Sequence, residues 1–127
     1  MRAALLIIVL TGLWVSAAEM KPAPEACAAI FQGEVVSVRM VQAMTNYPGL
    51  AYLHSARVRV GTVTKEDTKL GSEAVIYYVY CRDQICPRPV FLQQGQHLGL
   101  YCVRRTFAGL TNVLWVPSES FVQRAQP

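Results

Sequence analysis

The chain has 127 residues, with 12 basic and 8 acidic side chains and a formal net charge of +4. A balance this mild gives no argument for a nucleic-acid partner, which requires a strong basic excess. The length fits one domain behind a short leader, and 53% of the residues are hydrophobic, which is enough for a single core.

The first eighteen residues are typical of an export signal. Arg2 supplies an early positive charge, residues 3–15 form an uncharged apolar run, and small residues follow at 16–18. The run is shorter than the roughly 20 residues that a membrane span requires. We therefore predict a signal peptide over residues 1–18, cleaved after Ala18, with no membrane anchor. The mature chain is expected to be secreted or periplasmic.

Behind the signal, a proline-containing leader over residues 19–26 is expected to be extended. The domain is predicted to cover residues 27–127. Its first strand spans residues 30–41 and is interrupted by Gly33, which marks a bulge or a bend in the strand.

A second strand is predicted over residues 54–63, because its side chains alternate in character. Val58 and Val60 fall on one face, and Arg57 and Arg59 fall on the other. The two valines are expected to face the core and the two arginines to face solvent.

Three further strands are predicted over residues 74–80, 97–103 and 112–116. Pro117 ends the last strand, and Ser118 is expected to cap a short helical turn that holds Phe121 and Val122. Five short strands with little helix indicate an all-β sandwich or barrel. A closed barrel removes exposed strand edges, which favours it at this size.

All four cysteines lie in the predicted mature chain: Cys27, Cys81, Cys86 and Cys102. An even number in an exported chain favours two disulfides, for which three pairings exist. A zinc site is the alternative, but the sequence lacks the paired C-x-x-C spacing of such sites. We predict disulfides, no metal site and no cofactor.

The segment at residues 27–38, Cys-Ala-Ala-Ile-Phe-Gln-Gly-Glu-Val-Val-Ser-Val, resembles the opening strand of netrin-like domains. That family includes the tissue inhibitors of metalloproteinases. The similarity continues at residues 57–60, at Cys86, at Gly95 and at residues 115–117. It implies a small five-stranded, disulfide-stapled OB-type closed barrel with a short C-terminal helical turn, in agreement with the strand pattern.

The inhibitors of that family chelate the protease zinc through a cysteine at the first mature position. Here Cys27 lies eight residues beyond the predicted first residue, Glu19. Inhibition by zinc chelation is therefore not expected, and inhibition through another surface stays an alternative.

Disulfide pairing follows from the implied barrel, in which the first and fourth strands are antiparallel neighbours. Cys27 opens the first strand and Cys102 lies near the end of the fourth, so we predict a Cys27–Cys102 bridge and a local Cys81–Cys86 bridge. The family's link between its N-terminal region and the loop after the third strand suggests Cys27–Cys86 as the alternative.

Few residues of the sequence suit catalysis. His54 and His97 lie on different predicted strands, and no nucleophile or phosphate-loop motif occurs. We predict no catalytic residues and no enzymatic activity.

Binding is the better hypothesis. OB-type barrels bind ligands along their second and third strands, where Arg57 and Arg59 would meet an acidic partner and Tyr78 would offer aromatic surface. The sequence thus predicts a secreted binding module for an unknown protein or an acidic glycan. A purely structural secreted domain and an enzyme are the alternatives.

Overall fold

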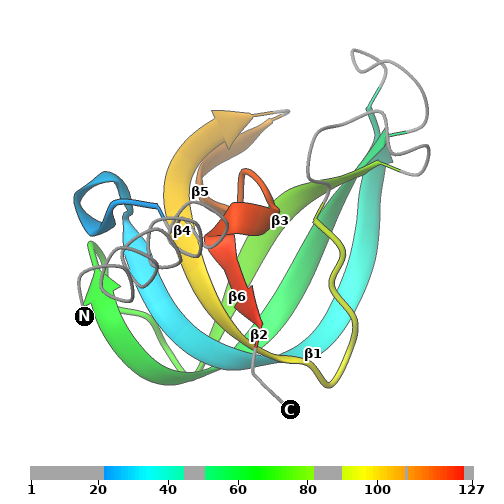
Figure 1. Ribbon diagram of the computed structural model, residues 1–127. Helices are drawn as coiled ribbons and strands as arrows, with labels where there is room; N and C mark the ends of the chain where they lie inside the picture. Colours follow the sequence, from blue (N-terminus) through cyan, green and yellow to red (C-terminus); the bar gives the residue numbers. More distant parts are fainter. Residues whose placement is uncertain (1–21, 45–50, 82–89, 108, 125–127) are drawn as a thin grey trace, which may run out of the picture.

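The computed structural model describes residues 22–44, 51–81, 90–107 and 109–124, and strands dominate it (Figure 1). The strands are β1 (Ala29–Ala43), β2 (Ala51–Glu66), β3 (Glu73–Cys81), β4 (His97–Phe107), β5 (Leu110–Trp115) and β6 (Val122–Arg124). Within these ranges the helical elements are two 3₁₀ turns, η1 (Pro24–Ala26) and η2 (Glu119–Phe121). The prediction of an all-β fold is confirmed. The predicted signal peptide lies outside the described residues.

Each of the five predicted strands is present, and most extend beyond the predicted bounds. The C-terminal turn is also present as η2, but Ser118 does not cap it. Its Oγ lies instead 2.8 Å from Oγ of Ser120. Val122, expected in the turn, begins the unpredicted strand β6. The leader also differs from the expectation, because its described part contains η1.

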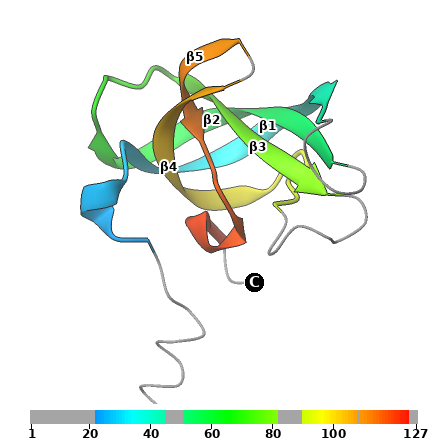
Figure 2. The ribbon, with the colours of Figure 1, turned by 90° about the horizontal axis from the view of Figure 1, so that it is seen from above.

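The strands form one sheet that closes on itself. The order is β1-β2-β3-β5-β4-β6, and β1 also pairs with β4, so five strands make a ring (Figure 1 and Figure 2). The pairings are antiparallel except for β3 with β5, which run parallel. That seam has two residue pairs, Ile76 with Leu114 and Tyr77 with Trp115. A hollow of about 370 Å³ lies beside it.

Strand β1 is bonded along both of its edges. Residues 29–34 pair with β4 while the whole strand pairs with β2, and the register against β2 shifts at four points. Gly33 lies at one of these shifts, where a Cβ atom would stand 2.4 Å from Cγ1 of Val58 and 2.6 Å from the carbonyl oxygen of Arg59. No side chain fits there, and the predicted irregularity at Gly33 is confirmed.

The main hydrophobic core takes side chains from all six strands. Its largest fully buried members include Phe31, Ile76 and Leu100, and the segment before β4 adds Val90 and Leu92. Burial of each such side chain stabilises the fold by about 1.5–3 kcal/mol. Burial of the core therefore stabilises the closed ring.

A second, smaller cluster packs on the opposite face of β2 and β3. Leu53 and Trp115 are buried in it. The guanidinium carbon of Arg105 lies 4.8 Å from the ring centroids of both Phe107 and Trp115, which is cation–π geometry. Strands β2 and β3 are thus covered on both faces over part of their length.

The cysteines of the predicted long-range bridge lie next to each other as free thiols. Cys27 and Cys102 are both buried, and the amide of Ala28 donates to the carbonyl of Cys102 at 2.8 Å. The Cys27–Cys102 bond is therefore not formed in this structure. Burial raises the pKa of both thiols, to about 12 for Cys102, where the neighbouring Cys27 adds to the effect. Such thiols stay protonated at neutral pH and are slow to oxidise.

Cys81 is disulfide-bonded. Its predicted partner, Cys86, lies outside the described residues, so the pairing of these two cysteines stays a prediction.

We expect Cys27 and Cys102 to form a bridge during folding in an oxidising compartment, as β1 and β4 bring them together and before burial raises their pKa values. Closing a loop of about 75 residues would stabilise the fold by about 4 kcal/mol in the loop-entropy description. Peptide mapping without reductant should link the Cys27 peptide to the Cys102 peptide. A link from the Cys27 peptide to the Cys86 peptide would show that this pairing is wrong.

Candidate functional site

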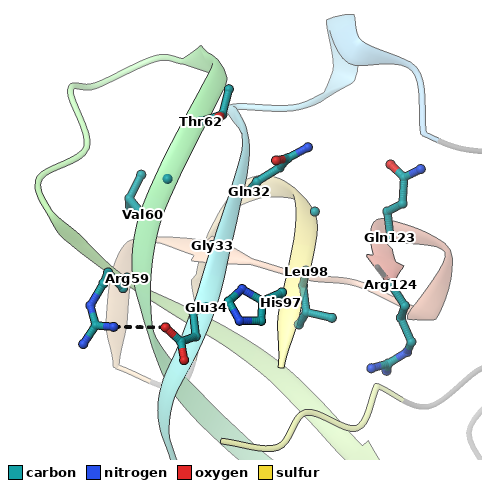
Figure 3. A pocket seen from close by; sticks show the side chains of 12 residues that line it. Gln32, Gly33, Glu34, Arg59, Val60, Thr62, His97, Leu98, Gln123 and Arg124 are labelled. Atoms are coloured by element: carbon teal, nitrogen blue, oxygen red, sulfur yellow. Dashed lines mark hydrogen bonds and ion pairs between the residues drawn. The ribbon is translucent and has the colours of Figure 1, made fainter. Parts of the chain in front are cut away.

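A groove of about 550 Å³ lies on the solvent-facing side of β1 and β4, between β2 and β6 (Figure 3). Its lining comes from residues 32–34 of β1, 59–62 of β2, 97–99 of β4 and 123–124 of β6. Because side chains alternate along a strand, Gln32 and Glu34 both face into the groove while Gly33 faces the other way.

The first row of side chains across the groove carries charge. Glu34 lies directly opposite Arg59 on β2 and opposite His97 on β4. Nη1 of Arg59 donates to Oε1 of Glu34 at 3.0 Å. Both side chains are exposed to solvent, so this ion pair contributes at most about 1 kcal/mol to stability. Its main effect is to orient the two groups.

The second row consists of two amides with a glycine between them. Gln32 on β1 lies opposite Gly99 on β4, and Gly99 lies opposite Gln123 on β6. Figure 3 shows the two glutamine side chains on either side of β4. A Cβ atom at Gly99 would stand 3.3 Å from Cβ of Gln123. The glycine at position 99 therefore lets β6 approach β4 closely and leaves the backbone of β4 without a side chain in this row.

Arg124, at the edge of the groove, is held by its own chain. Its Nε lies 2.7 Å from Oε1 of Glu119, and its Nη2 donates to Oε2 of Glu119 at 3.1 Å and to the carbonyl of Phe91 at 2.9 Å. Together with the Arg59–Glu34 pair, this leaves both arginines of the described lining paired with carboxylates of the protein.

The two arginines of the predicted site do point outward, as the alternation of β2 predicts. They are 54% and 63% exposed, Arg57 and Arg59 respectively. Only Arg59 lines the groove. Nη2 of Arg57 donates to both carboxylate oxygens of Glu73, at 2.9 and 3.2 Å. An acidic partner would have to compete with a carboxylate of this chain at each arginine.

Tyr78, the third predicted site residue, does not lie on the surface. It is 1% exposed and belongs to the main core, where it makes a hydrogen bond with the backbone of Leu92. Burial raises the pKa of Tyr78 to about 12. The predicted role of Tyr78 in binding is wrong for this structure, because the side chain that was expected outside packs inside.

The two histidines lie in different environments. His54 packs against the rings of Tyr78 and Tyr80, with centroids 5.5 and 5.4 Å away, and burial lowers its pKa. His97 is exposed in the groove. Among the residues that the structure describes, no three His, Cys, Asp or Glu side chains are grouped so that they could hold a metal ion. Over the same residues, no helix has the length and apolar character needed to cross a membrane.

The sequence pattern did not predict that most of the groove residues belong to a site, namely Gln32, His97, Gly99 and Gln123. One signal was available, because Gln32 and Glu34 flank Gly33 and must share a face of a strand. The rest depends on which strands become neighbours, and Gln123 lies on a strand that was not predicted.

We expect Tyr78 to make stability fall at high pH. Its pKa in the folded state exceeds the unfolded value of about 10. Below about pH 10 both states keep the proton, and above it the unfolded state loses the proton first. The free energy of unfolding should then fall by about 1.4 kcal/mol per pH unit from this group, up to about pH 12.

Denaturant unfolding of the protein and of Tyr78→Phe between about pH 9 and about pH 11 measures this effect, since the variant lacks the ionisation. Tyr101→Phe is the control, because it also removes a tyrosine hydroxyl from a strand of the sheet. Equal pH slopes for the protein and for Tyr78→Phe would contradict the assignment.

A scan against models of known protein families finds no match for this chain, and a search of curated proteins finds no significant relative. The function is therefore inferred from the geometry of the ring and the groove.

Proposed function

We propose that this chain is an exported binding module whose OB-type, netrin-like barrel presents the groove over β1, β4 and β6 to a polar ligand. The observation that carries the proposal is the second row, in which two exposed glutamines face each other across the bare backbone of Gly99. Glycine is used where a ligand must approach a backbone closely. The groove volume, about 550 Å³, falls in the range of ligand sites.

The barrel interpretation is supported by the strand ring. Its five strands close through the β1–β4 pairing, as in a small barrel without open edges. The turn at η2 and the bend at Gly33 also agree with the expected architecture.

The arrangement of the charged groups in the groove favours a binding function over a catalytic one. The carboxylate of Glu34 is engaged by Arg59, and Glu34 and His97 lie in an open, solvent-facing row. Zinc chelation by Cys27 is not proposed, because its nitrogen is an amide that donates to the carbonyl of Pro24 at 3.1 Å. A chelating residue of that type needs a free amine.

Export is the first part of the proposal to test. N-terminal sequencing of the protein recovered from the extracellular or periplasmic fluid of its host should find a chain that begins near Glu19. The apolar run before that residue supplies the physical reason, since it suits the export machinery. Recovery of the chain from the cytosol with Met1 intact would contradict export.

Filling the groove should weaken binding. In Gly99→Val the added side chain stands between the two glutamines, where a Cβ atom would lie 3.3 Å from Cβ of Gln123, so Gln123 and its strand have to shift slightly. Quantitative pull-down from the native fluid should recover the bound ligand about tenfold less with the variant. Near-ultraviolet circular dichroism checks that the variant is folded.

Gly71→Val is the matched control. A Cβ atom there would lie 3.8 Å from its nearest neighbour, the carbonyl oxygen of Glu73, and Gly71 lies outside the groove. Recovery equal to that of the unmodified protein is expected for this control. Equal recovery for Gly99→Val would rule out the groove as the binding site.

A further inference from the structure

We infer that the ligand of the groove is an uncharged oligosaccharide, an inference that rests on the proposed binding function. The groove presents planar polar groups from four strands. Glu34 and Gln32 come from β1, Arg59 from β2, His97 from β4, and Gln123 and Arg124 from β6. Amide, carboxylate and guanidinium groups each offer two polar atoms along one edge.

Sugar hydroxyls match this set of groups. Each hydroxyl both donates and accepts hydrogen bonds, and adjacent hydroxyls of a sugar ring present two oxygens along one edge. A glutamine amide can therefore donate to one hydroxyl and accept from its neighbour. Gln32 and Gln123 flank Gly99, which has no side chain, so their amides can engage one sugar ring from two sides if the amide of Gln123 turns away from Gly99.

The charge state of the groove favours a neutral ligand over an acidic one. The guanidiniums of Arg59 and Arg124 already bind Glu34 and Glu119. A carboxylate or sulfate on the ligand would meet guanidiniums whose charge is already balanced, and it would be repelled by the carboxylates of Glu34 and Glu119. Uncharged hydroxyls can instead bond to the remaining donor and acceptor sites of the same pairs.

A polypeptide ligand fits the groove less well. Protein interfaces are anchored mainly by aromatic and other large apolar side chains in pockets. The described lining has no Phe, Tyr or Trp, and its Leu98 is buried with 4% exposure. The lining combines hydrogen-bonding side chains with some apolar surface, and we expect modest affinity because it has no Phe, Tyr or Trp ring to stack on the sugar.

The test is an NMR titration of the mature chain with four neutral hexasaccharides: cellohexaose, maltohexaose, mannohexaose and N-acetylchitohexaose. Hexagalacturonate serves as the acidic probe and a polar, unstructured peptide as the third. At least one neutral hexamer should shift the amide signals of residues 32–34, 97–99 and 122–124. Replacement of Gln32 or Gln123 by alanine should weaken that binding by about tenfold each, as expected for a lost hydrogen-bonding side chain.

Gln42→Ala is the matched control, because Gln42 is an exposed glutamine of the same strand outside the groove. It should leave binding unchanged. Shifts with hexagalacturonate or with the peptide alone, or no shifts with any neutral hexamer, would overturn the ligand class. If the groove-dependent pull-down persists in that case, the binding function stands and only the ligand class fails. Loss of both would reject the function itself.

Discussion

The ring depends on one strand being hydrogen-bonded along both edges. Residues 29–34 of β1 pair with β2 and with β4 at the same time, which requires the strand to bend and coil. Gly33 permits this because the space that its side chain would occupy belongs to Val58 and to the backbone of Arg59. Without that approach the six strands would form an open sheet with long unpaired edges. The same bend sets Gln32 and Glu34 between β2 and β6, so closure of the ring also creates the groove.

Ion pairs within the chain determine how charge is distributed over the surface. Arg57, Arg59, Arg104 and Arg124 each hold a carboxylate of the chain, respectively on Glu73, Glu34, Asp67 and Glu119. The hydrogen bonds from Arg104 hold the pKa of Asp67 below its ordinary value. Each pair is weak, but each places a carboxylate of the chain beside an arginine, so these four arginines are balanced locally.

Local patterns predicted the strands better than they predicted the site. The alternation of Val58 and Val60 with Arg57 and Arg59 predicted β2 correctly, because one face of that segment packs on the core and the other is exposed to solvent. Because side chains alternate along a strand, Tyr77 and Tyr78 must point to opposite faces, and the structure places them in different clusters. Alternation could not tell which tyrosine faces the main core, because apolar clusters cover both sides of β3.

Strand β6 escaped prediction for a different reason. Three residues carry no periodic pattern, and their conformation is fixed only by pairing with β4. The groove depends on this pairing, because it places Gln123 on one side of β4 while Gln32 lies on the other side. Sites that are assembled from several strands are visible in a sequence only when the order of those strands is already known.

The parallel seam between β3 and β5 has a mechanical consequence. It holds two residue pairs, the fewest of any seam in the ring, and one flanking hydrogen bond from Val116 to Tyr77. Local opening costs least where the fewest backbone bonds must break. Amide protons along this seam should therefore exchange with solvent before those of β1. Opening there would expose the free edges of β3 and β5, and two copies of the chain could exchange their C-terminal strands through that gap without unfolding the doubly bonded β1.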